Sequence, residues 1–246
     1  MTEWMLRGYV TPEDFGGDVQ AALDAAEKLD IRKVILEKDY SCGKLTIPAY
    51  THLIINGTLK ADLQSRHLTG WNFEQDRFFL EGGGKVEGDV TFFNTRRAVL
   101  EGLRVKGTVT FLFSRDFRME NCHVDTLLVG RGCANAILQH LRLDRAAISQ
   151  AVFDGDIVHA KDPQIQSIVL RDSRFLGQGL MLLANEAAGL TNIQADHLIA
   201  PQTAVTLGEA GTSLPPERYF NLTFTDLEAP QPLKLLNETK HAYLKP

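Results

Sequence analysis

The chain has 246 residues, of which 44% are hydrophobic and 23% are charged, so it can bury a continuous core and is not expected to be disordered. Its formal net charge of −5 disfavours a nucleic-acid partner, because such domains carry a net positive charge or a dense basic patch. No apolar run approaches the roughly 20 residues of a membrane helix, and the start lacks the basic-then-apolar plan of a signal peptide. We therefore expect a cytoplasmic protein that binds neither nucleic acid nor a membrane.

The first predicted element is an Ala-rich helix that runs from Asp18 to Leu29. Its residues Val19, Leu23 and Ala26 fall on one stripe with Leu29, which is typical of an amphipathic helix, and Asp18 can accept the N-cap hydrogen bond. Short apolar strands follow directly. Because an open solenoid end exposes core and unpaired strand edges, this helix is predicted to cap the first of a series of stacked coils.

From residue 98 onward, a degenerate pattern repeats with small or apolar residues at i, i+2, i+5 and i+7. The two-residue steps are strand alternation, and the three-residue step is a kink at which the chain turns a corner and stays in the core. The gaps between equivalent positions range from 15 to 29 residues, which suits coils of constant core geometry with variable loops. The predicted equivalent i+2 positions are Leu100, Met119, Leu138, Phe153, Leu170, Ile193 and Leu222.

Stacked coils place equivalent strands roughly 4.8 Å apart in parallel ladders, and no coil buries its apolar face alone. The pattern predicts an all-β fold, a single-stranded right-handed parallel β-helix (solenoid) with the N-terminal capping α-helix. The alternative, an antiparallel sandwich, would need hairpin signals, and Asn56-Gly57 is the one such dipeptide. We expect a single domain whose entry segment with capping helix, coils, and C-terminal cap or tail occupy residues 1–32, 33–228 and 229–246.

Several segments resemble a known superfamily. Thr11-Pro-Glu-Asp-Phe-Gly16 with the helix after it, then Leu45-Thr-Ile-Pro48 and Leu53-Ile-Ile-Asn-Gly57, resemble the pectate-lyase-like (pectin-lyase-like) β-helix superfamily, and most closely its phage and prophage tailspike-type branch. The later units Glu120-Asn-Cys-His-Val124 and Arg171-Asp-Ser-Arg-Phe175 resemble its coils. The chain lacks that branch's Gly-Asp-Gly-x-x-Asp-Asp stretch, the polygalacturonase motifs Asn-Thr-Asp, Gly-His-Gly and Arg-Ile-Lys, and a clear lyase calcium cluster. The resemblance implies fold more specifically than activity.

Outward residues of equivalent strands form columns in such a solenoid, and two columns are predicted on one sheet face. The i+6 column is predicted to hold Arg104, His123, Arg142, Ile157, Arg174, His197 and Asp226. The i+8 column is predicted to hold Lys106, Asp125, Asp144, His159, Leu176, Ile199 and Glu228.

These columns predict a saccharide groove. The carboxylates of Asp125 and Asp144 would approach within roughly 5 Å on successive coils, so they would act as acid and base or hold a divalent cation such as calcium; no other cofactor is expected. Arginine forks suit the carboxylates of an acidic sugar polymer, and the histidines can move protons near neutral pH. The predicted catalytic residues are Asp125, Asp144 and His123, and the predicted substrate-binding residues are Arg104, Arg142, Arg174, His159 and His197. In the alternative interpretation, Asp125 and Asp144 pair with Arg142, Arg104 or Lys106 on a solvated face.

Two functions remain open at this point. The first is a carbohydrate-binding or carbohydrate-active protein that acts on an acidic polysaccharide, by hydrolysis or lyase chemistry if it is an enzyme. The second is a non-catalytic structural or assembly module, because Gly84-Lys-Val-Glu-Gly-Asp-Val90 and Val105-Lys-Gly-Thr-Val109 resemble the short coils of bactofilin-type polymer-forming proteins. A β-helix can also associate along its side into a homo-oligomer, as tailspike trimers do. The absent enzyme motifs favour the second function.

Overall fold

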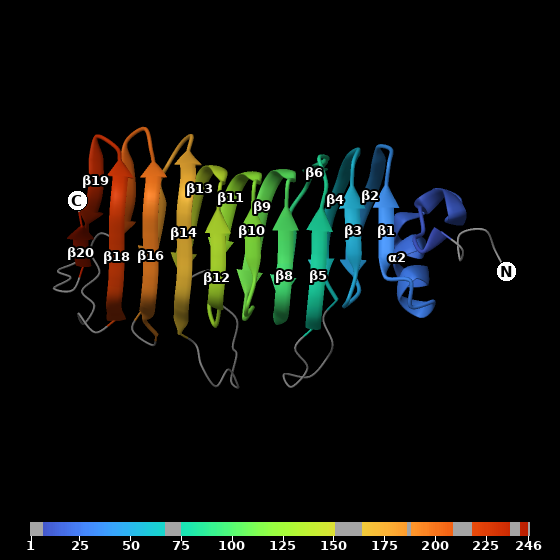
Figure 1. Cartoon of the computed structure of the whole chain (residues 1–246), viewed down its shortest axis with the longest axis horizontal. Helices are drawn as coiled ribbons and strands as arrows, with labels where there is room; N and C mark the ends of the chain where they lie inside the picture. Colours follow the sequence, from blue (N-terminus) through green and yellow to red (C-terminus); the bar gives the residue numbers. More distant parts are fainter. Residues whose placement is uncertain are drawn as a thin grey trace.

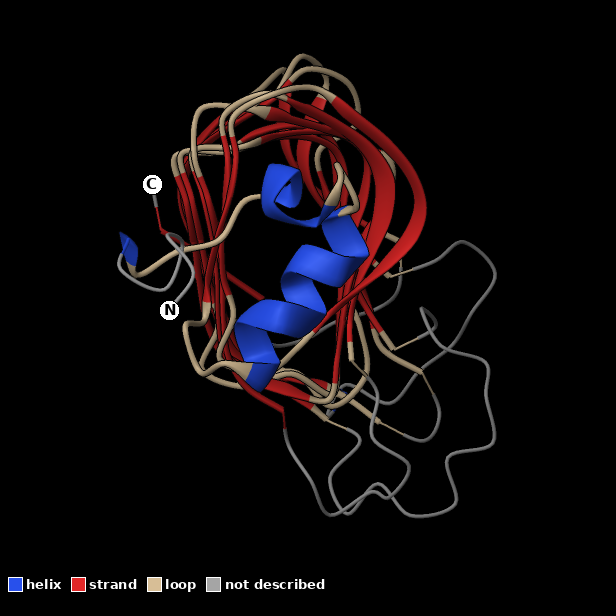
Figure 2. Ribbon diagram, turned by 90° about the vertical axis from the view of Figure 1, so that its right-hand side faces the viewer, coloured by secondary structure: helices blue, strands red, loops and turns tan. Residues whose placement is uncertain are grey.

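The computed structural model describes residues 7–66, 75–150, 164–185, 188–208, 218–236 and 242–245. The chain forms a right-handed parallel β-helix, whose coils stack from the N-terminus at the right of Figure 1 to the C-terminus at the left. Viewed along this stack in Figure 2, the coils enclose one elongated section, and a helix lies across the near end. The predicted fold class is confirmed.

Two ladders of parallel strands make up the coils. The first ladder faces the viewer in Figure 1 and contains β1 (Lys33–Leu36), β3 (His52–Ile55), β5 (Gln75–Glu81), β8 (Thr95–Glu101), β10 (Arg118–Glu120), β12 (Ala134–Gln139), β14 (Ile165–Phe175), β16 (Leu190–Ile199), β18 (Tyr219–Glu228) and β20 (Ala242–Lys245). The second ladder contains β2 (Tyr40–Ile47), β4 (Thr58–Ser65), β6 (Lys85–Glu87), β7 (Val90–Phe93), β9 (Arg104–Leu112), β11 (His123–Val129), β13 (Arg142–Ser149), β15 (Leu180–Leu183), β17 (Thr203–Leu207) and β19 (Gln231–Leu235). Parallel pairing continues through β19 and β20, past the predicted coil limit at residue 228.

The core is a set of inward columns between the ladders. Leu100, Met119 and Leu138 are stacked in register on β8, β10 and β12 and are fully buried, as the repeat predicts. Period-two alternation places them inward because successive side chains of a strand point to opposite faces. Burial also raises the pKa of the Cys122 and Cys133 thiols to about 12.

The predicted register between β14 and β16 is wrong by two residues, whereas the predicted equivalence of Ile193 and Leu222 on β16 and β18 is confirmed. Leu170 lies opposite Ala195 of β16, and Ile193 lies opposite Ile168. All of these side chains point inward, so an apolar alternation is satisfied equally well by either register. The predicted equivalent Phe153 lies outside the described residues.

From β5 onward, the chain turns from the first ladder to the second through a residue with positive φ. Such φ values disfavour most side chains, and glycine, Asn, Asp and His tolerate them best. These residues are stacked at one corner of the solenoid, with φ between 48° and 128°, and we call them the corner ladder: Gly82, Gly102, Asn121, His140, Asp172, His197 and Asp226. The corner ladder separates the outward columns of the two strand ladders.

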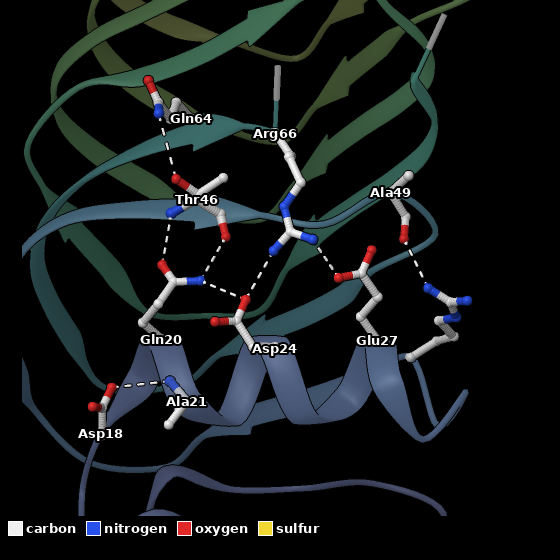
Figure 3. A network of polar contacts seen from close by, with 10 residues as sticks. Asp18, Gln20, Ala21, Asp24, Glu27, Thr46, Ala49, Gln64 and Arg66 are labelled. Carbon is white, nitrogen blue, oxygen red and sulfur yellow. Dashed lines mark hydrogen bonds and ion pairs between the residues drawn. The ribbon is translucent and has the colours of Figure 1, made fainter. Parts of the chain in front are cut away.

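The N-terminal end is closed by a short 3-10 helix, η1 (Pro12–Phe15), and by α2 (Val19–Lys28). The Asp18 side chain accepts a hydrogen bond from the Ala21 amide, which confirms it as the N-cap. Figure 3 shows that the Gln20 amide both donates to the Thr46 carbonyl (3.0 Å) and accepts from the Thr46 amide (2.8 Å). This pairing replaces the neighbouring strand that β2 lacks.

An ion-pair network completes this cap. Arg66, which directly follows β4, donates to Asp24 (2.8 Å) and to Glu27 of α2. The buried face of α2 supplies Val19 and Leu23 to the core. The helix is therefore fixed to the first coils both by these apolar contacts and by the polar contacts of Gln20, Asp24 and Glu27. Among the described residues, no helix is long and apolar enough to cross a membrane.

Candidate functional site

Lysine, arginine and histidine side chains form an outward column on the second ladder, which we call the basic column. Its members lie opposite one another on β6, β9, β11, β13 and the end of β14: Lys85, Arg104, His123, Arg142 and Arg174. The sequence pattern had predicted the last four in this order. It missed Lys85 because β6 precedes the first unit of the recognised repeat, although Lys85-Val-Glu87 shows the same alternation as Arg104-Val-Lys106.

His197 does not belong to the basic column. The residue opposite Arg174 is Ile199, because the predicted register of β16 was displaced by two residues. His197 lies instead in the corner ladder, with φ 48° and its Nδ1 3.0 Å from the Asp172 Oδ1. His159, the other predicted substrate-binding histidine, lies outside the described residues.

The basic column carries excess positive charge. Among the charged residues of β9, β11, β13 and the last three positions of β14, Arg and Lys occur five times and Asp twice, in a chain of net charge −5. Arg142 and Arg174 are exposed and directly opposite. Neither has a side-chain hydrogen bond or ion pair with another described residue, and the same holds for Arg104. Like charges directly opposite destabilise a strand pair, so this arrangement favours an external anion.

Asp125 and Asp144 lie beside the basic column. They occupy equivalent positions, because Val124 pairs with Leu143 and Thr126 pairs with Arg145 on either side of them. Adjacent parallel strands are roughly 4.8 Å apart, so the two side chains leave neighbouring coils at equivalent positions. Within the described ranges, neither carboxylate accepts a hydrogen bond or ion pair, so the alternative pairing with Arg142, Arg104 or Lys106 is not formed.

An open depression of about 500 Å³ adjoins these carboxylates and is lined by Asp125, Thr126, Asp144, Arg145, Leu176, Gly177 and Gln178. Arg145 Nε donates to Thr126 Oγ1 (3.0 Å), which holds this guanidinium at the floor. A bulge shapes one side, where the register of β9 and β11 shifts between Val124 and Thr126. The described residues contain no group of three or more His, Cys, Asp or Glu side chains arranged to hold a metal ion.

A second group of titratable residues lies at the corner, where His140, Asp172, His197 and Asp226 follow one another on successive coils. The hydrogen bond that His197 donates to Asp172 raises the pKa of His197 above its usual value, with a further contribution from the charge of Asp226. The same hydrogen bond from His197 lowers the pKa of Asp172.

This pair predicts a pH dependence of stability. The contribution of His197 is present below its unfolded pKa and is lost as the pH rises through its raised folded pKa, above about 6.5. The contribution of Asp172 is present above its unfolded pKa and is lost as the pH falls through its lowered folded pKa. We expect Asp172→Asn to return the pKa of His197 toward its usual value, measured by NMR titration of the imidazole. Asp226→Asn, which removes a charge and no hydrogen bond, is expected to shift it less. An unchanged His197 titration in Asp172→Asn would contradict the pairing.

Comparisons with known proteins are limited to solved structures: no family model matches the chain, and no curated protein matches it. The chain is similar to a mutant tailspike protein of E. coli bacteriophage HK620 in complex with a pentasaccharide (TM-score 0.47, 9% identity, 98% of this chain covered), and it spans 65% of that chain's length. It is also similar to the catalytic domain of a GH87 alpha-1,3-glucanase in complex with tetrasaccharides (TM-score 0.32, 10% identity, 97% of this chain and 68% of that one). The Agl-KA catalytic domain gives a TM-score of 0.32 at 14% identity, over 96% of this chain and 67% of that one. These values leave the function of this chain to be inferred from its own residues.

Proposed function

We propose that the protein binds a linear acidic polysaccharide along the basic column. The observation that carries this proposal is the directly opposite pair Arg142 and Arg174, with Arg104 beyond His123 in the same column; none of the three arginines has an acidic partner within the described ranges. Like charges that lie opposite each other on neighbouring strands repel and lower the stability of the fold. An anionic ligand bound along the column would offset this repulsion. The guanidinium fork binds carboxylates through paired hydrogen bonds.

The spacing of the column supports a polymer as the ligand. Successive positions are roughly 4.8 Å apart along the solenoid axis, a distance comparable to the length of one sugar residue. A polyuronate that lies along this axis would therefore present a carboxylate near each cationic side chain. The depression beside Asp125 and Asp144 offers room for one sugar next to the bound chain.

The carboxylate pair supports a second proposal, turnover of the bound polymer. In a hydrolytic reaction, one of Asp125 and Asp144 would protonate the glycosidic oxygen, so that the leaving sugar departs as an alcohol while the other attacks the anomeric carbon. Water, deprotonated by the first carboxylate, would then hydrolyse the glycosyl-enzyme ester and regenerate both groups. His123 lies on the same outward face, two residues before Asp125, and would exchange protons with solvent. In this role the Asp residues act on sugar bound by the basic column, so binding comes first.

The binding proposal predicts the behaviour of charge-removing variants. We expect polygalacturonate and alginate to bind, dextran to bind much less, and affinity to fall as salt rises. Arg142→Gln combined with Arg174→Gln is expected to weaken polygalacturonate binding roughly tenfold or more, because a hydrogen bond to a charged group contributes about 1.5–3 kcal/mol. The control is Arg96→Gln, which removes one charge from β8, where Arg96 pairs with Asp116 (3.5 Å), and it is compared with the single variants Arg142→Gln and Arg174→Gln. Isothermal titration calorimetry measures all of these affinities.

Several outcomes would contradict these proposals. Equal weakening in Arg96→Gln would show a general charge effect and remove the basic column as the site. No binding of either polyanion by the wild type would overturn the proposal and favour the assembly module, which light scattering then tests by oligomeric state. For turnover, product must appear with the wild type and disappear in Asp125→Asn/Asp144→Asn while binding persists; binding without product contradicts catalysis alone.

A further inference from the structure

The other strand ladder carries a shallow groove whose lining is uncharged. It spans the C-terminal coils, where β14, β16 and β18 lie side by side (Figure 1). The groove has a volume of about 240 Å³ and is lined by Ser167, Val169, Asn192, Ile193, Gln194, Asn221 and Thr223. Each coil contributes an equivalent pair of residues to the groove, so its chemistry repeats along the solenoid axis.

We propose that this groove binds a neutral oligosaccharide, at a site separate from the basic column. The polar side chains of its lining are amides and hydroxyls, which both donate and accept hydrogen bonds. Sugar hydroxyls have the same dual character. A charged ligand would find no counter-charge in this lining.

The hydrogen-bond state of the groove supports this assignment. Asn221 Nδ2 donates to Asn192 Oδ1 (2.7 Å), which orients both amides and leaves the Asn192 amide hydrogens and the Asn221 carbonyl oxygen available. Both asparagines have left-handed backbone conformations, with φ 54° and 52°, which hold them at fixed positions on the surface. Gln194 and Thr223 have no side-chain hydrogen bond within the described part of the chain.

The charged residues of the next outward column are engaged elsewhere. Arg171 donates to Gln139 Oε1 (2.8 and 2.6 Å), and Asp196 accepts from the Thr225 hydroxyl. Neither lines the groove. These hydrogen bonds direct the charged groups of Arg171 and Asp196 toward partners outside the groove, so the groove lining stays uncharged.

An exposed aromatic residue directly precedes one of the groove residues in the chain. Phe220 of β18 directly precedes Asn221 and is 59% exposed, the largest exposure among the large hydrophobic residues described. Burying apolar surface is favourable, and the apolar face of a sugar ring packs well on an aromatic ring. In this proposal, the exposed ring of Phe220 supplies a stacking surface for a sugar that is bound at the adjacent Asn221.

The test follows the side-chain amide signals of Asn192, Gln194 and Asn221 by NMR during titration. The probes are neutral glucan, mannan and xylan hexasaccharides, with hexagalacturonate as the charged comparison. We expect at least one neutral probe to shift these signals at millimolar concentration and hexagalacturonate to leave them unchanged. Absence of shifts with every neutral probe would overturn the proposal, as would stronger shifts with hexagalacturonate.

Variants separate this site from the basic column. Phe220→Ala is expected to weaken binding of the neutral probe roughly tenfold, since stacking and burial of one ring contribute about one power of ten in affinity. Gln194→Ala is expected to weaken it as well, while the matched control Phe79→Ala, an exposed aromatic on β5 (37% exposed), retains it. Unchanged affinity in both Phe220→Ala and Gln194→Ala would overturn the assignment. Arg142→Gln/Arg174→Gln is expected to retain neutral binding, so this site and the acidic-polysaccharide site succeed or fail independently.

Discussion

Replacing Gly82 with alanine is expected to destabilise the solenoid by about 3 kcal/mol or more. Gly82 opens the corner ladder at φ 128°, and an added Cβ would overlap the Ile55 carbonyl oxygen of the preceding coil and lie 2.9 Å from its carbon. Both obstacles are backbone atoms of a stacked coil, so relief would require the two coils to separate. The denaturant midpoint, followed by circular dichroism, measures this loss.

The adjacent Gly83 provides a matched control. An added Cβ there meets no atom within 4 Å, and its φ lies outside the left-handed region. Gly83→Ala is therefore expected to leave stability within about 0.5 kcal/mol of the wild type, or to raise it by restricting the unfolded chain. Equal destabilisation by the two substitutions would show that close approach between coils is not the constraint at this corner.

Truncating Phe111 to alanine is expected to cost about 4 kcal/mol of stability. Its ring is fully buried and stacks between Phe92 (centroids 4.9 Å apart) and Phe117 (4.2 Å). Removing the middle ring leaves a cavity that the outer rings cannot fill, because Phe92 is held by the pairing of β7 with β9 and the Phe117 carbonyl accepts a hydrogen bond from the Ile137 amide (3.1 Å).

Phe220→Ala is the control for this loss, because its ring is 59% exposed. It removes the same atoms from the surface and is expected to change stability by less than about 0.5 kcal/mol. Chemical denaturation of the two variants under the same conditions gives the comparison. If Phe111→Ala lowered the free energy of unfolding by no more than Phe220→Ala does, the aromatic stack would contribute little to stability.

Local features of the coils were predictable from the sequence because they depend on a few adjacent residues. The alternation of apolar and polar residues identified the inward side chains of strands such as β8 and β10. The apolar stripe of residues 19–29 identified the helix α2, and Asp18 identified its N-cap. The order of Arg104, His123, Arg142 and Arg174 also followed, since each of them lies two residues after a member of the corner ladder.

Register between distant coils was decided by the tertiary structure. Positions 193 and 195 are both inward, so alternation could not choose which of them stacks on Leu170, and the misplacement of His197 followed from that ambiguity. This ambiguity in register is removed only by the hydrogen-bonded pairing of neighbouring coils, in which the left-handed residues lie opposite one another at the corner. The same stacking brings Ser167, Asn192 and Asn221 into one groove and sets Arg142 against Arg174. The sequence by itself determined a solenoid of alternating strands, and the physical contact between coils determined which surface residues meet.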